Sequence, residues 1–306
     1  MLASLSIDLD GLELYHRIHG IAEPPRSGDP VFHKAVDRFG ELAARLGVTG
    51  TAFFVGRSLD DERARAGLRA LAAAGHEIGN HSLSHDYALS RRSRDEIAAE
   101  LRGGADAIAG ITGTRPIGFR APGYTLSAAL VAALAADGYR YDSSTFPALP
   151  YYVGKAAVMA ILATTGRRSG AVLDRARVLL APRRPYLPSA EEPYARGGGP
   201  LVELPITTGL AGFPLTGTFV ATLPHTALRV LSAGTRALPL FNLELHGLDL
   251  LDASDTGPAL AARQRDLLVP ASEKMTRLAR YVRSLAGREW VPLATAAERL
   301  GPALAS

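Results

Sequence analysis

The chain has 306 residues, a formal net charge of +4 and no cysteine. This length is sufficient for one large α/β domain with an extensive hydrophobic core. The lack of cysteine excludes disulfides, thiolate zinc sites and a cysteine nucleophile, so a bound metal ion would need histidine and carboxylate ligands. The longest apolar run, residues 156–166, has roughly ten residues, whereas about 20 are needed to span a bilayer. No secretory signal is visible before the first predicted strand, and we expect a cytoplasmic location.

The first 146 residues alternate strand patterns with helix patterns, which is typical of a parallel sheet. The expected strands are residues 4–11, 48–55, the run that leads to His81, 117–120 and 139–142. The expected helices are residues 30–46, 60–74, 93–111 and 127–137, and residues 11–29 are expected to form a loop. The helix at 93–111 begins with a capping box, Ser93-Arg94-Asp95-Glu96.

The alternation breaks at about residues 147–200 and then returns. The break contains two apolar and basic helical segments and Gly197-Gly198-Gly199, a pattern that indicates an insertion. The elements expected after it are strands at 201–206 and 240–246, a helix at 258–286 broken at Pro270, a short strand at 290–293 and a C-terminal helix. We predict one α/β domain over residues 1–306, a distorted (β/α) barrel with an inserted helical segment.

Two histidines and two aspartates suggest a metal site. His81 and His85 are four residues apart, and a helical turn that begins near His81 would place both on one face. Asp8 and Asp10 end the first strand, where alternation puts them on the same side. Two imidazoles and a carboxylate can hold one metal ion and leave positions open for water and substrate. The alternatives are exposed histidines in a polar loop and an Asp-Gly turn at a strand end.

Further polar residues follow the predicted strands, at the end of a barrel where active sites gather. They are Asp10, His81, Arg120, Asp142 and His246. In a hydrolytic site a carboxylate takes a proton from water and a histidine protonates the leaving amine, roles that Asp8 and His246 fit. Arg120 enters a Pro-Gly turn from an apolar strand and needs an anion, although it could instead only bridge two loops.

Two motifs resemble the polysaccharide deacetylase family, which is the NodB homology domain of carbohydrate esterase family 4. They are residues 75–85, GHEIGNHSLSH, and residues 119–124, FRAPGY. The likeness covers residues 4–147 and the strand at 243–246. The first motif of the family usually has adjacent aspartates, whereas Leu9 separates them here. This spacing resembles the branch with peptidoglycan-deacetylase-like and allantoinase-like members.

The resemblance implies a role for each matching residue. Asp10, His81 and His85 would bind a divalent metal ion, for which zinc is expected. Asp8 would be the general base, held ionised and oriented by Arg120. His246 would be the general acid, tuned by Asp142, although Phe146 stands in that motif where the family commonly has tryptophan. The backbone N–H of Gly123 would face the oxyanion, and Tyr124 and Leu245 would contact the substrate.

The function implied is hydrolysis of an N-acyl group, acetyl or formyl, from an amino sugar that is lipid-linked or part of a polysaccharide precursor. One alternative is a metal-free hydrolase of a cyclic amide, as in allantoinase-like relatives. Another is a carbohydrate-binding relative without turnover. No nucleic-acid partner is expected. His16 and His19 lie after the first strand and could touch the substrate, but we expect a surface role for them.

Residues 155–184 carry seven basic residues and one acid, Asp174, a balance of +6. The apolar residues between these charges indicate helices with one apolar side. Such a segment is typical of contact with an anionic membrane surface. We therefore expect a lipid-linked or phosphate-bearing sugar that is met at the inner face of the membrane. The alternative is that these helices pack on the barrel and the arginines only solvate its outer face.

Overall fold

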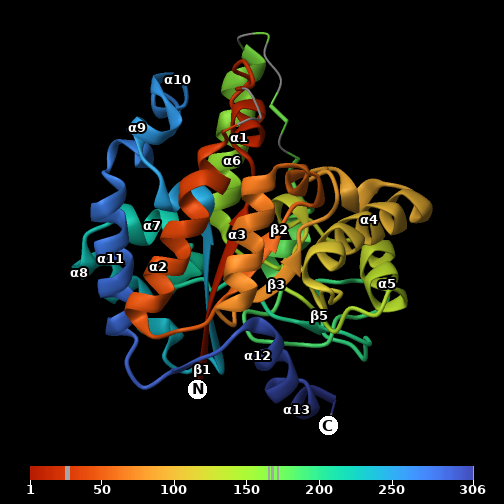
Figure 1. Cartoon of the computed structure of the whole chain (residues 1–306). Helices are drawn as coiled ribbons and strands as arrows, with labels where there is room; N and C mark the ends of the chain where they lie inside the picture. Colours follow the sequence, from red (N-terminus) through yellow and green to blue (C-terminus); the bar gives the residue numbers. More distant parts are fainter. Residues whose placement is uncertain (25–27, 165, 167–168, 171, 306) are drawn as a thin grey trace.

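The computed structural model describes residues 1–24, 28–164, 166, 169–170 and 172–305. Its centre is a parallel sheet of eight strands in the order β6-β5-β4-β3-β2-β1-β7, with β8 paired to β1 (Figure 1). The sheet curls into a distorted (β/α) barrel, as predicted. The strands are β1 Leu2–Leu9, β2 Thr51–Phe54, β3 Glu77–Asn80, β4 Gly118–Phe119, β5 Tyr141–Asp142, β6 Val202–Glu203, β7 Leu240–His246 and β8 Glu289–Trp290.

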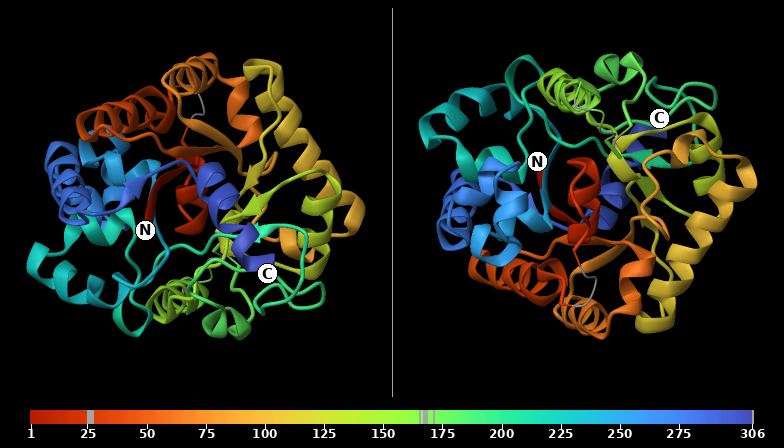
Figure 2. Two further views of the ribbon diagram at one scale, coloured as in Figure 1. Left: turned by 90° about the horizontal axis from the view of Figure 1, so that it is seen from below. Right: turned by 90° about the horizontal axis from the view of Figure 1, so that it is seen from above.

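Helices surround the sheet as a ring (Figure 2). The α-helices are α1 Leu12–Ile18, α2 Val36–Leu46, α3 Glu62–Ala73, α4 Arg94–Thr112, α5 Ala128–Ala136, α6 Leu149–Thr164, α7 Gly217–Thr222, α8 His225–Leu231, α9 Ala253–Thr256, α10 Pro258–Ala261, α11 Ala271–Ser284, α12 Leu293–Leu300 and α13 Pro302–Ala305. Shorter helical segments are η1 Val31–Ala35, η2 Gly56–Asp60, η3 Leu89–Arg91, η4 Pro122–Tyr124, η5 Ala176–Leu180, η6 Leu210–Gly212, η7 Ser232–Thr235, η8 Gly247–Leu250 and η9 Arg265–Leu268.

Strand β1 separates an apolar side from a polar side. Leu5, Ile7 and Leu9 are fully buried in the main hydrophobic cluster, together with residues of α2, α3 and α11. Ser4 and Ser6 are also fully buried, on the alternate positions that face the interior of the barrel. The same period of two extends to Asp8, so the sequence of β1 determines which of its side chains can reach the site.

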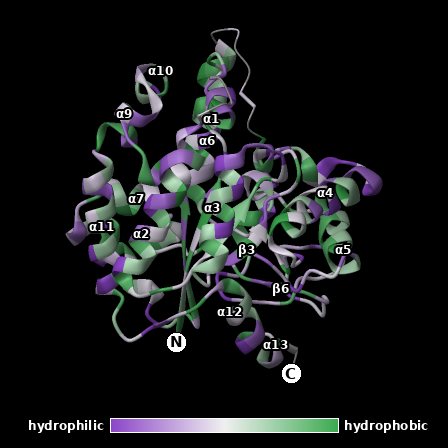
Figure 3. Ribbon diagram, viewed as in Figure 1, coloured by the Kyte–Doolittle hydropathy of each residue, from purple (hydrophilic) through white to green (hydrophobic). Residues whose placement is uncertain are grey.

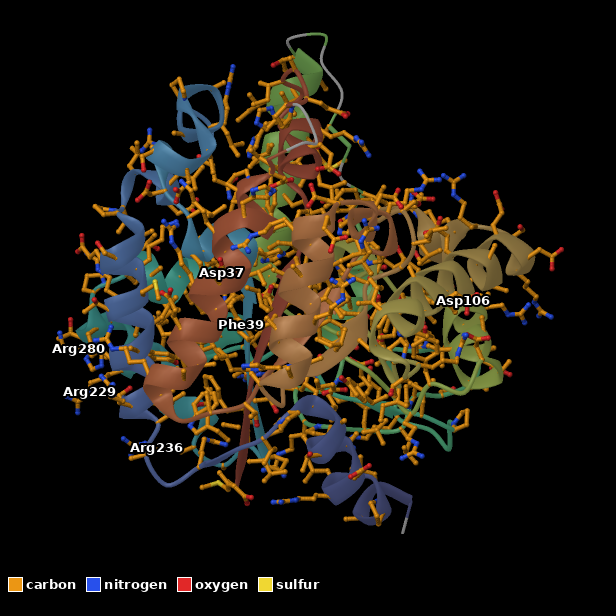
Figure 4. All side chains as sticks on the ribbon, in the orientation of Figure 1. Asp37, Phe39, Asp106, Arg229, Arg236 and Arg280 are labelled. Carbon is orange, nitrogen blue, oxygen red and sulfur yellow. The ribbon has the colours of Figure 1, made fainter. Side chains whose placement is uncertain are left out.

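Hydropathy along the helices matches this layering. Figure 3 shows hydrophilic and hydrophobic residues interleaved along α2, α3 and α11, as expected for helices with one buried face. Phe39 of α2 is completely buried. Charged side chains such as Asp106, Arg229 and Arg280 lie at the outer edges of the molecule (Figure 4). No helix in the described ranges is long and apolar enough to cross a bilayer.

The two ends of the barrel differ. Both chain termini lie at the end where β1 begins, whereas α1 and α6 project at the end where the strands finish (Figure 1). In the view from above, α1 lies over the middle of that end (Figure 2). The active site of such a barrel is expected at the carboxyl ends of its strands. Residues of α1 and α6 are therefore placed to line it.

The barrel wall has a seam between β6 and β7, which stand at opposite ends of the strand order. Thr207 bridges it, because its backbone N–H donates to the carbonyl of Asn242 at 3.1 Å. Its hydroxyl accepts from the backbone N–H of Asn242 at 2.8 Å. The side-chain amide of Asn242 donates to Ser143 at 2.9 Å. One backbone hydrogen bond and a few side-chain contacts thus stand at this seam in place of a continuous ladder.

Most predicted elements are confirmed, including the capping box at Ser93 and the break at Pro270, which precedes α11. The prediction of a loop over residues 11–29 was wrong, because it contains α1. Leu12 and Tyr15, at helical spacing, bury one face of this helix. Within the predicted insertion, α6 is an α-helix, but the second helical segment forms only the short η5.

Candidate active site

The two aspartates of the first strand converge on His81. Asp10 Oδ1 lies 3.2 Å from His81 Nε2. Asp8 Oδ2 lies 3.9 Å from the same nitrogen. All three side chains are buried. The prediction that Asp8 and Asp10 share one side of the chain is confirmed.

His81 and His85 come together through a strained loop and not through a helical turn, so that prediction was wrong. Ser82 and His85 adopt left-handed backbone conformations, with φ of 65° and 57°. The Ser82 hydroxyl accepts the backbone N–H of His85 at 3.0 Å and stabilises the loop. The two imidazole centroids lie 4.8 Å apart.

Asp10, His81 and His85 fit a divalent metal ion. Each offers one ligand atom, and these atoms lie within 4.8 Å of one another. The N–H at His81 Nδ1 donates to the carbonyl of Arg120 at 2.6 Å, which leaves the Nε2 lone pair free as a ligand. Asp10 Oδ1 is buried without a hydrogen-bond donor in the described residues. Burial would raise the pKa of Asp10, but His85 and His81 hold that pKa well below its usual value.

Arg120, which directly follows β4, forms an ion pair with Asp8. It is completely buried, and its Nη1 donates to Asp8 Oδ1 at 2.7 Å. The rest of the guanidinium donates to the Ser143 carbonyl at 2.8 Å and to the Ser6 hydroxyl at 3.0 Å. Burial raises the pKa of Asp8, and Arg120 opposes that rise. Asp8 Oδ2 has no hydrogen-bond donor among the described residues and can accept a proton.

A second charged pair lies across the site on β7. Glu244 Oε1 is 2.9 Å from His246 Nδ1. Tyr124 donates its hydroxyl to Glu244 at 3.0 Å and lies 3.1 Å from His246 Nε2. Burial would lower the pKa of His246, but Glu244 raises it well above its usual value. The raised pKa favours the protonated form of His246.

Asp8, Asp10, His81 and His246 line a cavity of about 360 Å³ at the carboxyl ends of the strands, a size suited to a small ligand. Helices α1, α6 and α7 complete its wall. The lining residues include Asp8, Asp10, His81, His246, Tyr15, His19, Tyr87, Gly123, Tyr124, Tyr151, Lys155, Thr218 and Phe219. His19, for which a surface role was expected, lines the cavity and bonds to Gln264 at 2.8 Å. His16 is buried against the carbonyl of Ala22.

Residues 29–141 match the family model for polysaccharide deacetylase. This part of the chain is similar to the polysaccharide deacetylase family. A peptidoglycan deacetylase from Helicobacter pylori is 25% identical to it over 158 residues, which are 50% of this chain and 53% of that protein. The chain thus spans about half of the length of this curated relative.

Solved structures support the observed fold. Puue allantoinase superposes with a TM-score of 0.61 and 17% identity, over 100% of this chain and 91% of that one. A probable polysaccharide deacetylase from Pseudomonas aeruginosa PAO1 gives a TM-score of 0.60 and 16% identity, over 100% and 92% of the two chains. At these identities the likeness establishes the architecture alone.

Asp142 does not contact His246, contrary to the expectation that it would tune the histidine. Asp142 and Glu203 are register partners on β5 and β6 and pair with each other inside the barrel. Ser144 also donates to Asp142 at 2.7 Å. Burial raises the pKa of both acids, which allows them to share a proton. Glu244 takes the place predicted for Asp142.

The sequence analysis did not identify Glu244 as a site residue, although the pattern of β7 indicates it. The period of two along β7 puts Asn242, Glu244 and His246 on one face, and an acid inside an apolar strand needs a partner. The same alternation explains why Leu245 does not line the cavity. Its side chain is completely buried in the main hydrophobic cluster.

In the basic segment, residues 155–184, the described arginines bond to other parts of the protein. Arg183 donates to the carbonyl of Gly209 at 2.7 Å. Arg184 donates to the carbonyl of Ala237 at 2.7 Å. Arg175 bonds to Glu192 at 3.2 Å. Arg167 and Arg168 lie outside the described residues.

Proposed function

We propose that the protein is a metal-dependent hydrolase that removes an acetyl or formyl group from the nitrogen of an amino sugar. One observation carries this proposal: Asp10 and His81 of the three candidate metal donors line the same cavity as Asp8 and His246. Asp8 pairs with Arg120, and His246 pairs with Glu244. When bound, a divalent ion, for which we propose zinc, polarises a carbonyl oxygen and lowers the pKa of water. The match of residues 29–141 to the polysaccharide deacetylase family model and the peptidoglycan deacetylase relative support the sugar amide as substrate.

Asp8 is the proposed general base. Its Oδ2 atom lacks a hydrogen-bond donor in the described part of the chain, and Arg120 fixes the orientation of the carboxylate through Oδ1. Burial raises its pKa, which makes the carboxylate a stronger base. Asp8 thus takes the water proton while Arg120 keeps its negative charge in place.

His246 is the proposed general acid, with Glu244 in place of Asp142 as its charge partner. The carboxylate of Glu244 keeps the imidazole protonated and therefore able to donate to the leaving amine. Tyr124, which bonds to both, holds their relative orientation. The backbone N–H of Gly123, in the turn beside the cavity, is the proposed donor to the oxyanion.

We also propose one domain over residues 1–306, a cytoplasmic location and a lipid-linked or phosphate-bearing substrate met at the inner membrane surface. Support comes from α6, which borders the cavity and exposes Leu149, Val153 and Ile161. The bonds of Arg183 and Arg184 to backbone carbonyls remove them from this role. Co-sedimentation with anionic vesicles tests the membrane contact. Vesicle binding should weaken in the double variant Val153→Ser/Ile161→Ser.

The function is tested by metal analysis and by release of acetate or formate from a panel of N-acylated amino sugars. Asp8→Asn should keep the metal and lower turnover roughly 10²–10⁴-fold, because it removes the base and spares the ligands. Asp37→Asn on the exterior of α2 is the matched control. An Asp8→Asn variant within about threefold of the parent would show that Asp8 is structural. Turnover that resists chelation would favour the metal-free, allantoinase-like alternative, and bound metal without turnover would favour a binding protein.

A further inference from the structure

Lys155 of α6 brings a cation to the wall of the cavity. It is the one lysine or arginine among the described residues that line it. Its ammonium lies 5.5 Å from the centroid of the Tyr151 ring, which belongs to the preceding turn of the same helix. The side chain is thus held against an aromatic wall near the catalytic groups.

The ammonium of Lys155 is buried without a hydrogen-bond acceptor in the described part of the chain. A buried ammonium is costly unless an anion or several acceptors compensate for it. Asp174 influences Lys155, but it accepts bonds from Tyr194 and from the backbone of Arg175. The protein therefore supplies a charge at this position and leaves its donors unused.

The turn at Gly123 makes room for this arrangement. A Cβ atom on Gly123 would lie 2.8 Å from the Tyr87 ring and 3.5 Å from the Lys155 ammonium. The Tyr87 ring in turn packs edge-on against the metal-ligand candidate His85, with centroids 4.7 Å apart. The ammonium consequently sits beside the backbone of Gly123, next to the place proposed for the reacting acyl group.

We propose that Lys155 binds an anionic group, a phosphate or a carboxylate, carried on or beside the sugar ring that bears the N-acyl group. The substrate is then an acidic N-acyl amino sugar and not a neutral one. An ammonium provides three donors for anionic oxygens, and such charge-assisted bonds are stronger than neutral ones. The identity of the sugar rests on the proposed function, whereas the anion preference rests on Lys155 and the cavity.

A structural role for the charge of Lys155 is the competing explanation. The stem of Lys155 can pack on Tyr151 without its charge, and no carboxylate in the described ranges forms an ion pair with it. A packing role would therefore survive replacement by methionine, which keeps an unbranched apolar stem. Methionine at this position separates the two explanations.

The test measures binding by calorimetry at pH 7 in an Asp8→Asn background, so that no turnover is required. The probes are N-acetylglucosamine, its 1-phosphate, its 6-phosphate and N-acetylmuramic acid, which carries a carboxylate. Lys155→Met removes the charge, Lys155→Arg keeps it, and Lys34→Met is the control. Lys34 carries the same charge on the surface and lies outside the cavity.

At least one anionic probe should bind 10-fold or more tightly than N-acetylglucosamine. Lys155→Met should weaken that probe roughly 10- to 100-fold, the range for hydrogen bonds to charged groups, and leave N-acetylglucosamine unchanged. Lys155→Arg should retain the preference, and Lys34→Met should not alter it. The probe that loses most identifies phosphate or carboxylate as the group recognised.

Two results would overturn the proposal: no preference for any anionic probe, or a preference that persists in Lys155→Met. The second result would assign anion binding to the metal, which is common to both proteins. A preference that depends on Lys155 in a protein without deacylase activity would keep this inference and reject the proposed function.

Discussion

Arg120→Met should strongly destabilise the fold, because Arg120 is the buried cation that balances Asp8. The substitution retains an unbranched side chain but removes the bond to Asp8 Oδ1 and the bonds to Ser143 and Ser6. Asp8 is 1% exposed, so bulk solvent compensates little for the lost partner. Removal of one member of a buried ion pair typically costs about 3–5 kcal/mol. That cost is a large fraction of the roughly 5–15 kcal/mol that stabilises a typical domain.

The assay is urea unfolding of metal-free protein, followed by circular dichroism and analysed as a double-mutant cycle with Asp8→Asn. The double variant should recover roughly 1–3 kcal/mol relative to Arg120→Met, since the amide is not a buried uncompensated charge. Lys274→Met is the matched control. Lys274 is completely buried and pairs with Asp266 at 3.2 Å, and its loss should be additive with Asp8→Asn.

The loss of unfolding free energy in Arg120→Met should also depend on pH. Burial raises the pKa of Asp8 and Arg120 opposes this effect, so the pKa rises further when Arg120 is removed. The folded variant then binds a proton more readily than the unfolded chain, and its stability falls as pH rises through that window. The loss should be larger at pH 7 than at pH 5. A pH-independent loss, or a double variant no more stable than Arg120→Met, would refute the charge-balance argument.

Three further predictions concern the site. His85→Ala should lose bound metal and activity together by elemental analysis, and full metal content would reject it as a ligand. Glu244→Gln should lower kcat roughly 100-fold at unchanged metal content and move the loss of activity at high pH to a lower pH. The reason is that Glu244 raises the pKa of His246; an unchanged pH profile would contradict this pairing. Burial lowers the pKa of Lys155 from 10.5 to about 8, equivalent to about 3 kcal/mol. This destabilisation is complete below pH 8 and disappears toward pH 10.5. Lys155→Met should therefore raise the free energy of unfolding more at pH 7 than at pH 9.5. A lower free energy of unfolding at pH 7 would exclude a destabilising effect of the buried charge.

The convergence of residues at the candidate metal site was predictable where it depends on local spacing. Strand alternation was enough to bring Asp8 and Asp10 to one side, and parallel strand ends brought His246 to the same end. The route between His81 and His85 was not predictable from spacing. Their loop uses left-handed conformations at Ser82 and His85, which the sequence does not signal because neither residue is glycine.

Partners that are distant in the sequence were harder to predict. Asp142 lies on β5, which the order of strands places beside β6 and not beside β7, whereas Glu244 lies two residues before His246 on β7 itself. The register pairs Asp142 with Glu203, and β7 carries both Glu244 and His246. Lys155 was hard to interpret from the sequence for the same reason. The net charge of residues 155–184 suggested a membrane contact, whereas the position of α6 places Lys155 at the cavity wall.

The seam between β6 and β7 gives the barrel a line of low local stability. Amide protons exchange with solvent through openings whose free energies vary across a structure. The amide of Thr207, held by one bond across the seam, should exchange faster than that of Ile7 in β1, a strand flanked by ladders on both sides. An opening here would admit water to Asn242 and Ser143, and through Ser143 to the guanidinium of Arg120, while the ladders of β1 remain intact. Partial unfolding of this protein is thus expected to begin at its polar interior and not at its hydrophobic shell.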